Sequence, residues 1–107
     1  MLSSGWLFLI IAGILEISWA IGLKYSEGLT KLKPTIFTVI AMILSFVFLA
    51  KAVEKMPVGT AYAIWTGIGA VGTAILGMIL FKEPATAIRM VCMLLIVAGI
   101  VGLKFSS

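Results

Sequence analysis

Four apolar stretches, separated by short charged segments, are the feature of this 107-residue sequence that most limits how it can fold. They cover residues 5–23, 34–50, 57–81 and 86–103. Each is close to the roughly 20 residues that an α-helix needs to cross the hydrocarbon core of a bilayer. Only 11% of the residues are charged, whereas a water-soluble domain carries about 25%. The sequence therefore predicts an all-α membrane protein in which residues 1–107 form one transmembrane domain of four helices.

The three connecting segments are short and contain residues that favour turns. They are Lys24–Lys33, which precedes Pro34, then Lys51–Pro57, and Lys82–Pro84. Because such connections keep consecutive helices side by side, we expect antiparallel neighbours. The triplet Ser18-Trp19-Ala20 resembles a signal-peptide cleavage site. However, no Lys or Arg precedes the first apolar stretch and Glu16 interrupts it, so we expect this segment to be retained.

The positive charges favour neither orientation of the chain strongly. Four spans place both termini on one side of the bilayer, with Lys51, Lys55 and Lys104. The other side carries Lys24, Lys31, Lys33, Lys82 and Arg89. Lysine and arginine normally concentrate on the cytoplasmic side, and three against five is a weak bias. One interpretation is a single, weakly specified orientation, and the other is insertion in both orientations. The scattered charges form no basic stripe, so we expect no nucleic acid partner.

Glu16 is the acidic residue that the membrane prediction does not explain. The other three acidic residues lie in loops beside lysines, where solvated charges are ordinary. Glu16 precedes Lys24 by eight residues, which places it about 12 Å from that end of the helix at 1.5 Å per residue. A charge near the middle of the bilayer costs about 2.5–3.5 kcal/mol on insertion scales. We therefore interpret Glu16 as the functional centre. The alternative is a protonated or hydrogen-bonded residue in a helix contact.

Several aromatic and polar residues are candidates to act with Glu16. Trp19 follows it by three residues, and Tyr62 and Trp65 have the same spacing in the third helix. A carboxylate with aromatic rings suits an organic cation, through charge pairing and cation–π attraction. Ser45, in the middle of the second helix, is a candidate hydrogen-bond donor to the carboxylate. The alternatives are that Tyr62 anchors its helix at the interface and that Ser45 bonds its own helix backbone.

Glycines in the third helix have two interpretations. Gly67 and Gly69, followed by Gly72 and Gly77, either permit close helix packing or form a hinge. Cys92 is the only cysteine, so no disulfide can form within the chain, and we expect it to be a small packing residue.

Several motifs together resemble the small multidrug resistance family over the whole chain. They are Glu16, Leu23-Lys24-Tyr25-Ser26-Glu27-Gly28, and the run from Pro57 through Tyr62 and Trp65 to Gly67-Ile-Gly69. Within the family, Glu16-Ile-Ser-Trp19 and Lys82-Glu83-Pro84 resemble the branch of guanidinium exporters.

The resemblance implies a proton-coupled antiporter that exports guanidinium by alternating access as an antiparallel, dual-topology homodimer. It also implies a multi-pass protein of the bacterial inner membrane, with no enzyme activity, cofactor or metal. It places the shared proton and substrate carboxylate at Glu16 and the other binding residues at Trp19, Ser45, Tyr62 and Trp65. The hinge falls on Gly67 and Gly69. The dimer contact of the fourth helix falls on Cys92, Leu95, Ile96, Ala98, Gly99 and Ile100, with Cys92 at a position where the family has glycine.

The direction of the predicted helices is consistent with such an assembly. Many transporters use inverted repeats, but the two helix pairs of this chain enter the bilayer from the same side. Two chains in opposite orientations supply the inversion. Two nearby, buried copies of Glu16 would disfavour each other's charged form, so proton and cation compete for them.

Three other functions fit parts of the pattern. The first is a multidrug exporter of quaternary ammonium or polyaromatic cations, against which Trp19 argues by filling space beside Glu16. The second is a proton-binding rotor proteolipid, which is usually a two-helix hairpin. The third is a non-transporting accessory subunit that needs a different partner chain.

Overall fold

Four long α-helices make up nearly the whole of the computed structural model, which describes residues 4–106 and has no β-strand in that range. They are α1 (Ser4–Tyr25), α2 (Leu32–Val53), α3 (Val58–Leu80) and α4 (Ala87–Ser106). Each is long and apolar enough to cross a bilayer, so the prediction of four long apolar helices is confirmed. Helices α1, α2 and α4 extend past the apolar stretches because Lys24, Lys51 and Lys104 continue their last turns, where a positive charge favours the helix dipole.

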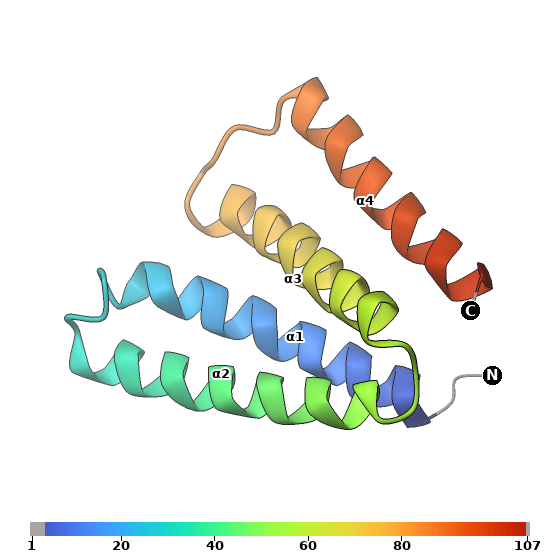
Figure 1. The fold of residues 1–107 in the computed structure, drawn as a ribbon. Helices are drawn as coiled ribbons and strands as arrows, with labels where there is room; N and C mark the ends of the chain where they lie inside the picture. The colour runs from blue at the N-terminus through green and yellow to red at the C-terminus, as the bar shows by residue number, and fades with distance from the viewer. Residues whose placement is uncertain (1–3, 107) are drawn as a thin grey trace.

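The helices form a layered arrangement with α3 in the middle. In Figure 1, α1 and α2 lie antiparallel beside each other, α3 packs against α1, and α4 lies on the far side of α3. The start of α1, the end of α4 and the α2–α3 loop lie at one end of the helices, and the other two loops lie at the opposite end (Figure 1). This agrees with four spans that place both termini on the same side of a bilayer.

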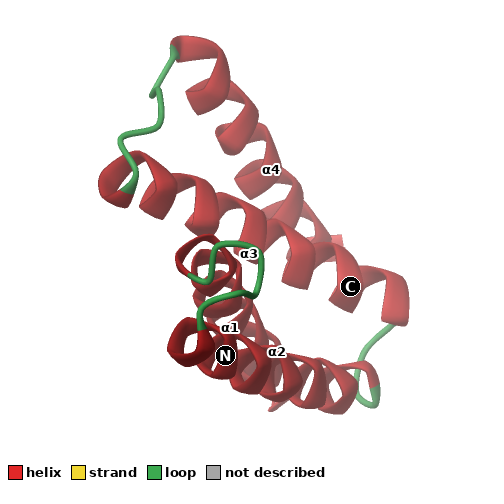
Figure 2. Ribbon diagram, turned by 90° about the vertical axis from the view of Figure 1, so that its left-hand side faces the viewer, coloured by secondary structure: helices red, strands yellow, loops and turns green. Residues whose placement is uncertain are grey.

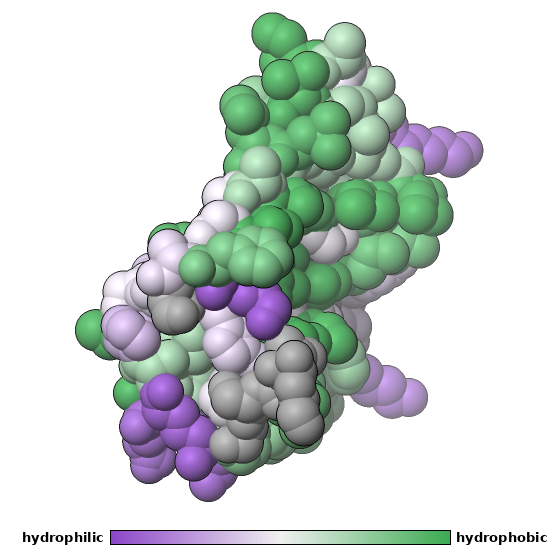
Figure 3. All heavy atoms as spheres, turned by 90° about the vertical axis from the view of Figure 1, so that its right-hand side faces the viewer, coloured by the Kyte–Doolittle hydropathy of each residue, from purple (hydrophilic) through white to green (hydrophobic). Residues whose placement is uncertain are grey.

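Helix α4 is the most exposed of the four. The quarter-turned view in Figure 2 shows it standing away from α1 and α2. None of its residues, all of which the structure describes, is fully buried. In Figure 3, apolar residues cover the upper part of the molecule, where α4 lies, and hydrophilic groups gather lower down. An apolar surface of this extent needs lipid or protein as its environment, and the chain is a multi-pass membrane protein.

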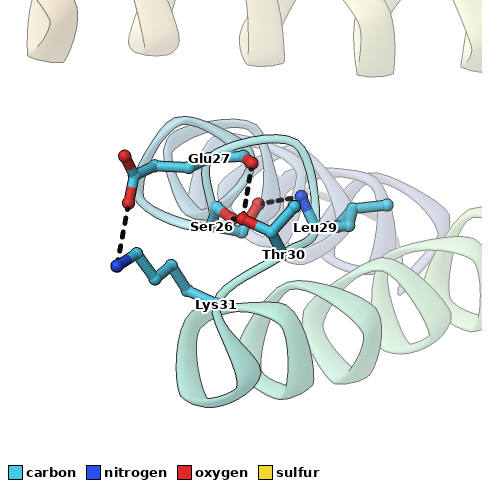
Figure 4. Close-up of polar contacts among 5 residues, drawn as sticks. All are labelled: Ser26, Glu27, Leu29, Thr30 and Lys31. Atoms are coloured by element: carbon cyan, nitrogen blue, oxygen red, sulfur yellow. Dashed lines mark hydrogen bonds and ion pairs between the residues drawn. The ribbon is translucent and has the colours of Figure 1, made fainter.

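The loop between α1 and α2 is held by the buried hydroxyl of Ser26. Its Oγ donates a hydrogen bond to the Leu23 carbonyl at 2.8 Å. The same oxygen accepts a hydrogen bond from the Leu29 backbone N–H at 3.0 Å (Figure 4). Glu27, Gly28 and Leu29 have φ angles of 49°, 76° and 70°. This left-handed region is unfavourable for residues other than glycine. The hydrogen bonds of Ser26 therefore stabilise a strained, compact turn that keeps α1 and α2 in contact.

Small residues allow α1 and α3 to approach each other closely. A Cβ on Gly13 would lie 2.6 Å from Ile68 Cγ2 and 2.9 Å from Ile68 Cβ, and a Cβ on Gly72 would collide with the side chain of Ile17. Close approach through glycines is a common way to pack helices in membranes, where lipid offers no hydrophobic driving force. The contact between α1 and α3 positions the residues discussed below.

This packing predicts that Gly13→Ala destabilises the protein. The added methyl group meets the branched, and therefore inflexible, Cβ of Ile68, and overpacking of this kind costs about 1–3 kcal/mol. Gly59→Ala is the matched control, because a Cβ there meets no atom of the described residues within 4 Å and alanine favours a helix by about 1 kcal/mol over glycine. Unfolding in detergent micelles, followed by circular dichroism, measures both. Equal midpoints for the two variants would contradict the close α1–α3 contact.

Candidate functional site

Glu16 lies on the face of α1 that contacts α3. Its carboxylate occupies the space directly beside Gly69, where a Cβ would collide with Oε1 and Cδ of Glu16. The side chain is therefore accommodated because position 69 has none. This contact explains one part of the glycine pattern in the third helix, since any larger residue at 69 would displace the carboxylate.

A cavity of about 460 Å³ begins at Glu16 and runs between α1 and α3. Its walls are mostly small or polar residues, which leave room between the helices. From α1 and α3 they are Ala20, Ile21, Lys24, Thr66, Gly69, Ala70, Thr73, Ala74 and Gly77, and the α3–α4 connection adds Phe81 and Glu83. Because Lys24 and Phe81 lie at the ends of their helices, the cavity connects Glu16 with that end of the bundle.

Two polar atoms of this cavity are buried and have no hydrogen-bond partner among the described residues. They are Oε1 of Glu16 and Oγ1 of Thr73. A buried polar atom that is left unsatisfied costs about 1–3 kcal/mol, and more when it is charged. The pair is therefore suited to a proton or to a ligand that brings N–H donors. Thr73 was not among the site residues predicted from the sequence, although its position four residues after Gly69 places it on the same helix face.

The predicted aromatic residues lie together, but they do not line the cavity described above. The rings of Trp19 and Phe46 are 6.4 Å apart, those of Phe46 and Trp65 are 5.7 Å apart, and those of Trp65 and Tyr62 are 5.4 Å apart. Phe46 of α2 joins Trp19 of α1 to the two aromatic residues of α3. Trp19 follows Glu16 by three residues, which turns it by about 60° around the helix. This offset directs Trp19 to α2 and Glu16 to α3.

Ser45 bonds neither of the two partners considered from the sequence. Its hydroxyl donates to the backbone carbonyl of Ala12 at 2.7 Å and accepts the indole N–H of Trp65 at 3.0 Å. A hydroxyl has one hydrogen to donate, so in this arrangement it does not donate to Glu16. Ala12 lies one turn before Glu16 in α1. Ser45 therefore ties α1, α2 and α3 together beside the carboxylate and fixes the ring of Trp65.

The glycines proposed as a hinge lie in a helix that is continuous through both positions. Gly67 packs under the side chains of Ile96 and Ile100 of α4, and Gly69 packs under Glu16. Both glycines thus serve close packing in this conformation, as one of the two interpretations expected.

The residues predicted for dimer contact divide into two groups on α4. Ile96 and Ile100 turn toward Gly67 of the same chain. The remaining four, Cys92, Leu95, Ala98 and Gly99, are exposed, and a Cβ on Gly99 would meet no described atom within 4 Å.

Known proteins are similar in sequence to this chain along nearly its whole length. A protein named "Guanidinium exporter" from Yersinia pseudotuberculosis is 57% identical over 102 residues, which are 95% of this chain and 98% of that protein. Proteins of the same name from Escherichia coli K12 and Citrobacter freundii are 55% and 57% identical over 95% of this chain and 97% of their own lengths. The family model described as "Small Multidrug Resistance protein" matches residues 4–96. The chain belongs to the small multidrug resistance family.

Proposed function

We propose that this protein exports guanidinium in exchange for protons, with Glu16 as the shared binding group. The proposed assembly is an antiparallel homodimer in the bacterial inner membrane that works by alternating access. The names of relatives that are 55% and 57% identical over 95% of the chain support guanidinium as the substrate. The location of Glu16, inside an apolar helix and at the end of a cavity, supports its role.

The unsatisfied carboxylate oxygen of Glu16 is the observation that carries the proposal. Oε1 is buried with no hydrogen-bond partner among the described residues, and Glu16 lines a cavity whose walls include Gly69 and Thr73. Guanidinium is planar and presents pairs of N–H donors whose geometry matches a carboxylate. A hydroxyl oxygen such as that of Thr73 can accept hydrogen bonds from the remaining N–H groups of guanidinium. A small, planar cation therefore fits the chemistry of this cavity.

Competition for one carboxylate couples the two fluxes when the site opens to one side of the membrane at a time. A charged carboxylate in an apolar environment is costly unless a counter-ion or a proton neutralises it. Binding of guanidinium and binding of a proton both achieve this, and each excludes the other at the same oxygen atoms. If the site opens to only one side of the membrane at a time, loading of one species accompanies release of the other.

The direction of the helices supports the proposed antiparallel dimer. Helices α1 and α3 run in the same direction, so one chain contains no inverted repeat from which two equivalent open states could be built. A second copy in the opposite orientation provides it, and the weak charge bias of the loops permits that insertion. The exposed residues Cys92, Leu95, Ala98 and Gly99 of α4 are the proposed contact with this second copy.

The proposal predicts that Glu16→Gln abolishes coupled transport. The neutral amide cannot pair with guanidinium, and loss of one partner of a buried ion pair costs about 3–5 kcal/mol, which is a hundredfold or more in affinity. Uptake of radiolabelled guanidinium into proteoliposomes with an imposed proton gradient measures the effect. Glu54→Gln, in the exposed α2–α3 loop, is the control and should transport normally. Proton-driven uptake by Glu16→Gln at the control rate would contradict the mechanism.

Dual insertion predicts that each loop is accessible from both sides of the membrane. In a Cys92→Ala background, Glu27→Cys and Lys55→Cys place single cysteines in exposed loops at opposite ends of the helices. A membrane-impermeant maleimide applied to intact spheroplasts should label about half of each variant, and permeabilisation should expose the other half. Complete labelling of one variant with none of the other would show a single orientation and would contradict the antiparallel dimer.

A further inference from the structure

The cavity that contains Glu16 has a second carboxylate at its other end. Glu83, in the connection between α3 and α4, lines the same cavity, and Glu16, Lys24 and Glu83 are the charged residues among its described lining. The carboxylate of Glu83 lies beside Gly77, where a Cβ would collide with it, and the Glu83 backbone N–H bonds the Gly77 carbonyl at 3.3 Å. Glu83 is therefore held at the mouth of the cavity rather than extended into solvent.

Glu83 already faces a guanidinium group, that of Arg89. One guanidinium nitrogen of Arg89, Nη2, is 3.6 Å from Glu83 Oε1, while Nη1 donates a hydrogen bond to the Pro84 carbonyl at 2.8 Å. The contact is long and uses a single nitrogen, whereas the strong carboxylate–guanidinium pair is bidentate and shorter. A carboxylate has about four acceptor positions. Glu83 therefore has the capacity to bind a further guanidinium-type cation or to exchange Arg89 for one.

The other groups at the mouth also suit a cation. The ring of Phe81 lines the cavity, and Lys24 Nζ lies 5.7 Å from the centre of that ring. This shows that the ring is accessible to a positive charge, which its face attracts. With Lys24 and Arg89 both nearby, Glu83 carries the negative charge of this mouth. Without it, an incoming cation would meet two positive side chains and no attraction.

We propose that Glu83 is a transit site at the cavity mouth, which captures guanidinium-type cations and passes them between solution and Glu16 in competition with Arg89. The inference rests on the function proposed above and adds a second residue to the path. Because two antiparallel copies place one such mouth at each face of the membrane, the same group serves capture on one side and release on the other.

The transport kinetics of four proteins test this inference. Glu83→Gln should raise the KM for guanidinium about 1.4- to fivefold with kcat nearly unchanged, since a half-exposed ion pair contributes about 0.2–1 kcal/mol. Arg89→Gln should lower the KM, because it frees Glu83 from its competitor. Glu27→Gln is the matched control: this exposed carboxylate also pairs with a basic side chain, Lys31 at 3.4 Å, but it does not line the cavity. It should transport like the unmodified protein.

Ionic strength separates an electrostatic role from a structural one. The difference in KM between Glu83→Gln and the unmodified protein should shrink in about 1 M salt, where charges are screened beyond about 3 Å. A KM for Glu83→Gln equal to that of Glu27→Gln, or a KM that rises in both Glu83→Gln and Arg89→Gln, would overturn the transit site. If the unmodified protein moves no guanidinium, the proposed function fails, and the transit site fails with it.

Discussion

The contact between Glu16 and Gly69 is the interaction on which the rest of this structure depends. A carboxylate inside an apolar helix is stable only where a partner or a polar cavity receives it. Gly69 provides the space, and the neighbouring glycines at 13 and 72 bring α1 and α3 close enough to form the wall behind it. The cavity, the unsatisfied oxygen atom and the path to the membrane surface all follow from this one close approach.

The helices were predictable from the sequence because bilayer thickness sets their length. The binding role of Glu16 stays a prediction, but its prominence was predictable because a charge in such a stretch is costly. Phe46 was not, since one more apolar residue in an apolar helix carries no signal. The partner of Ser45 depends on the rotation of three helices about their axes, and a sequence alone does not specify that rotation. Glu83 was interpreted as an ordinary solvated loop charge, and only the folded α3–α4 connection brings it to the cavity.

Helices α1, α2 and α3 are held together more closely than α4 is held to them. Ser45 links α1, α2 and α3 through the Ala12 carbonyl and the Trp65 indole. Helix α4 instead lies along α3 and leaves most of its apolar surface exposed. A rigid three-helix unit with an attached, exposed helix is a suitable subunit for a dimer, because the contact with a second copy can form without disturbing the site. The aromatic row from Trp19 to Tyr62 lies outside the cavity that Glu16 lines.

Proton flux driven by guanidinium is the most direct test of competition at a shared carboxylate. The purified chain alone is reconstituted into liposomes that contain a pH-sensitive dye, and a guanidinium gradient is imposed with no initial pH difference. Inward movement of guanidinium should drive protons outward, so the lumen should become alkaline, and tetraethylammonium at the same concentration should have little effect. Guanidinium entry without any change in luminal pH would contradict the shared site at Glu16.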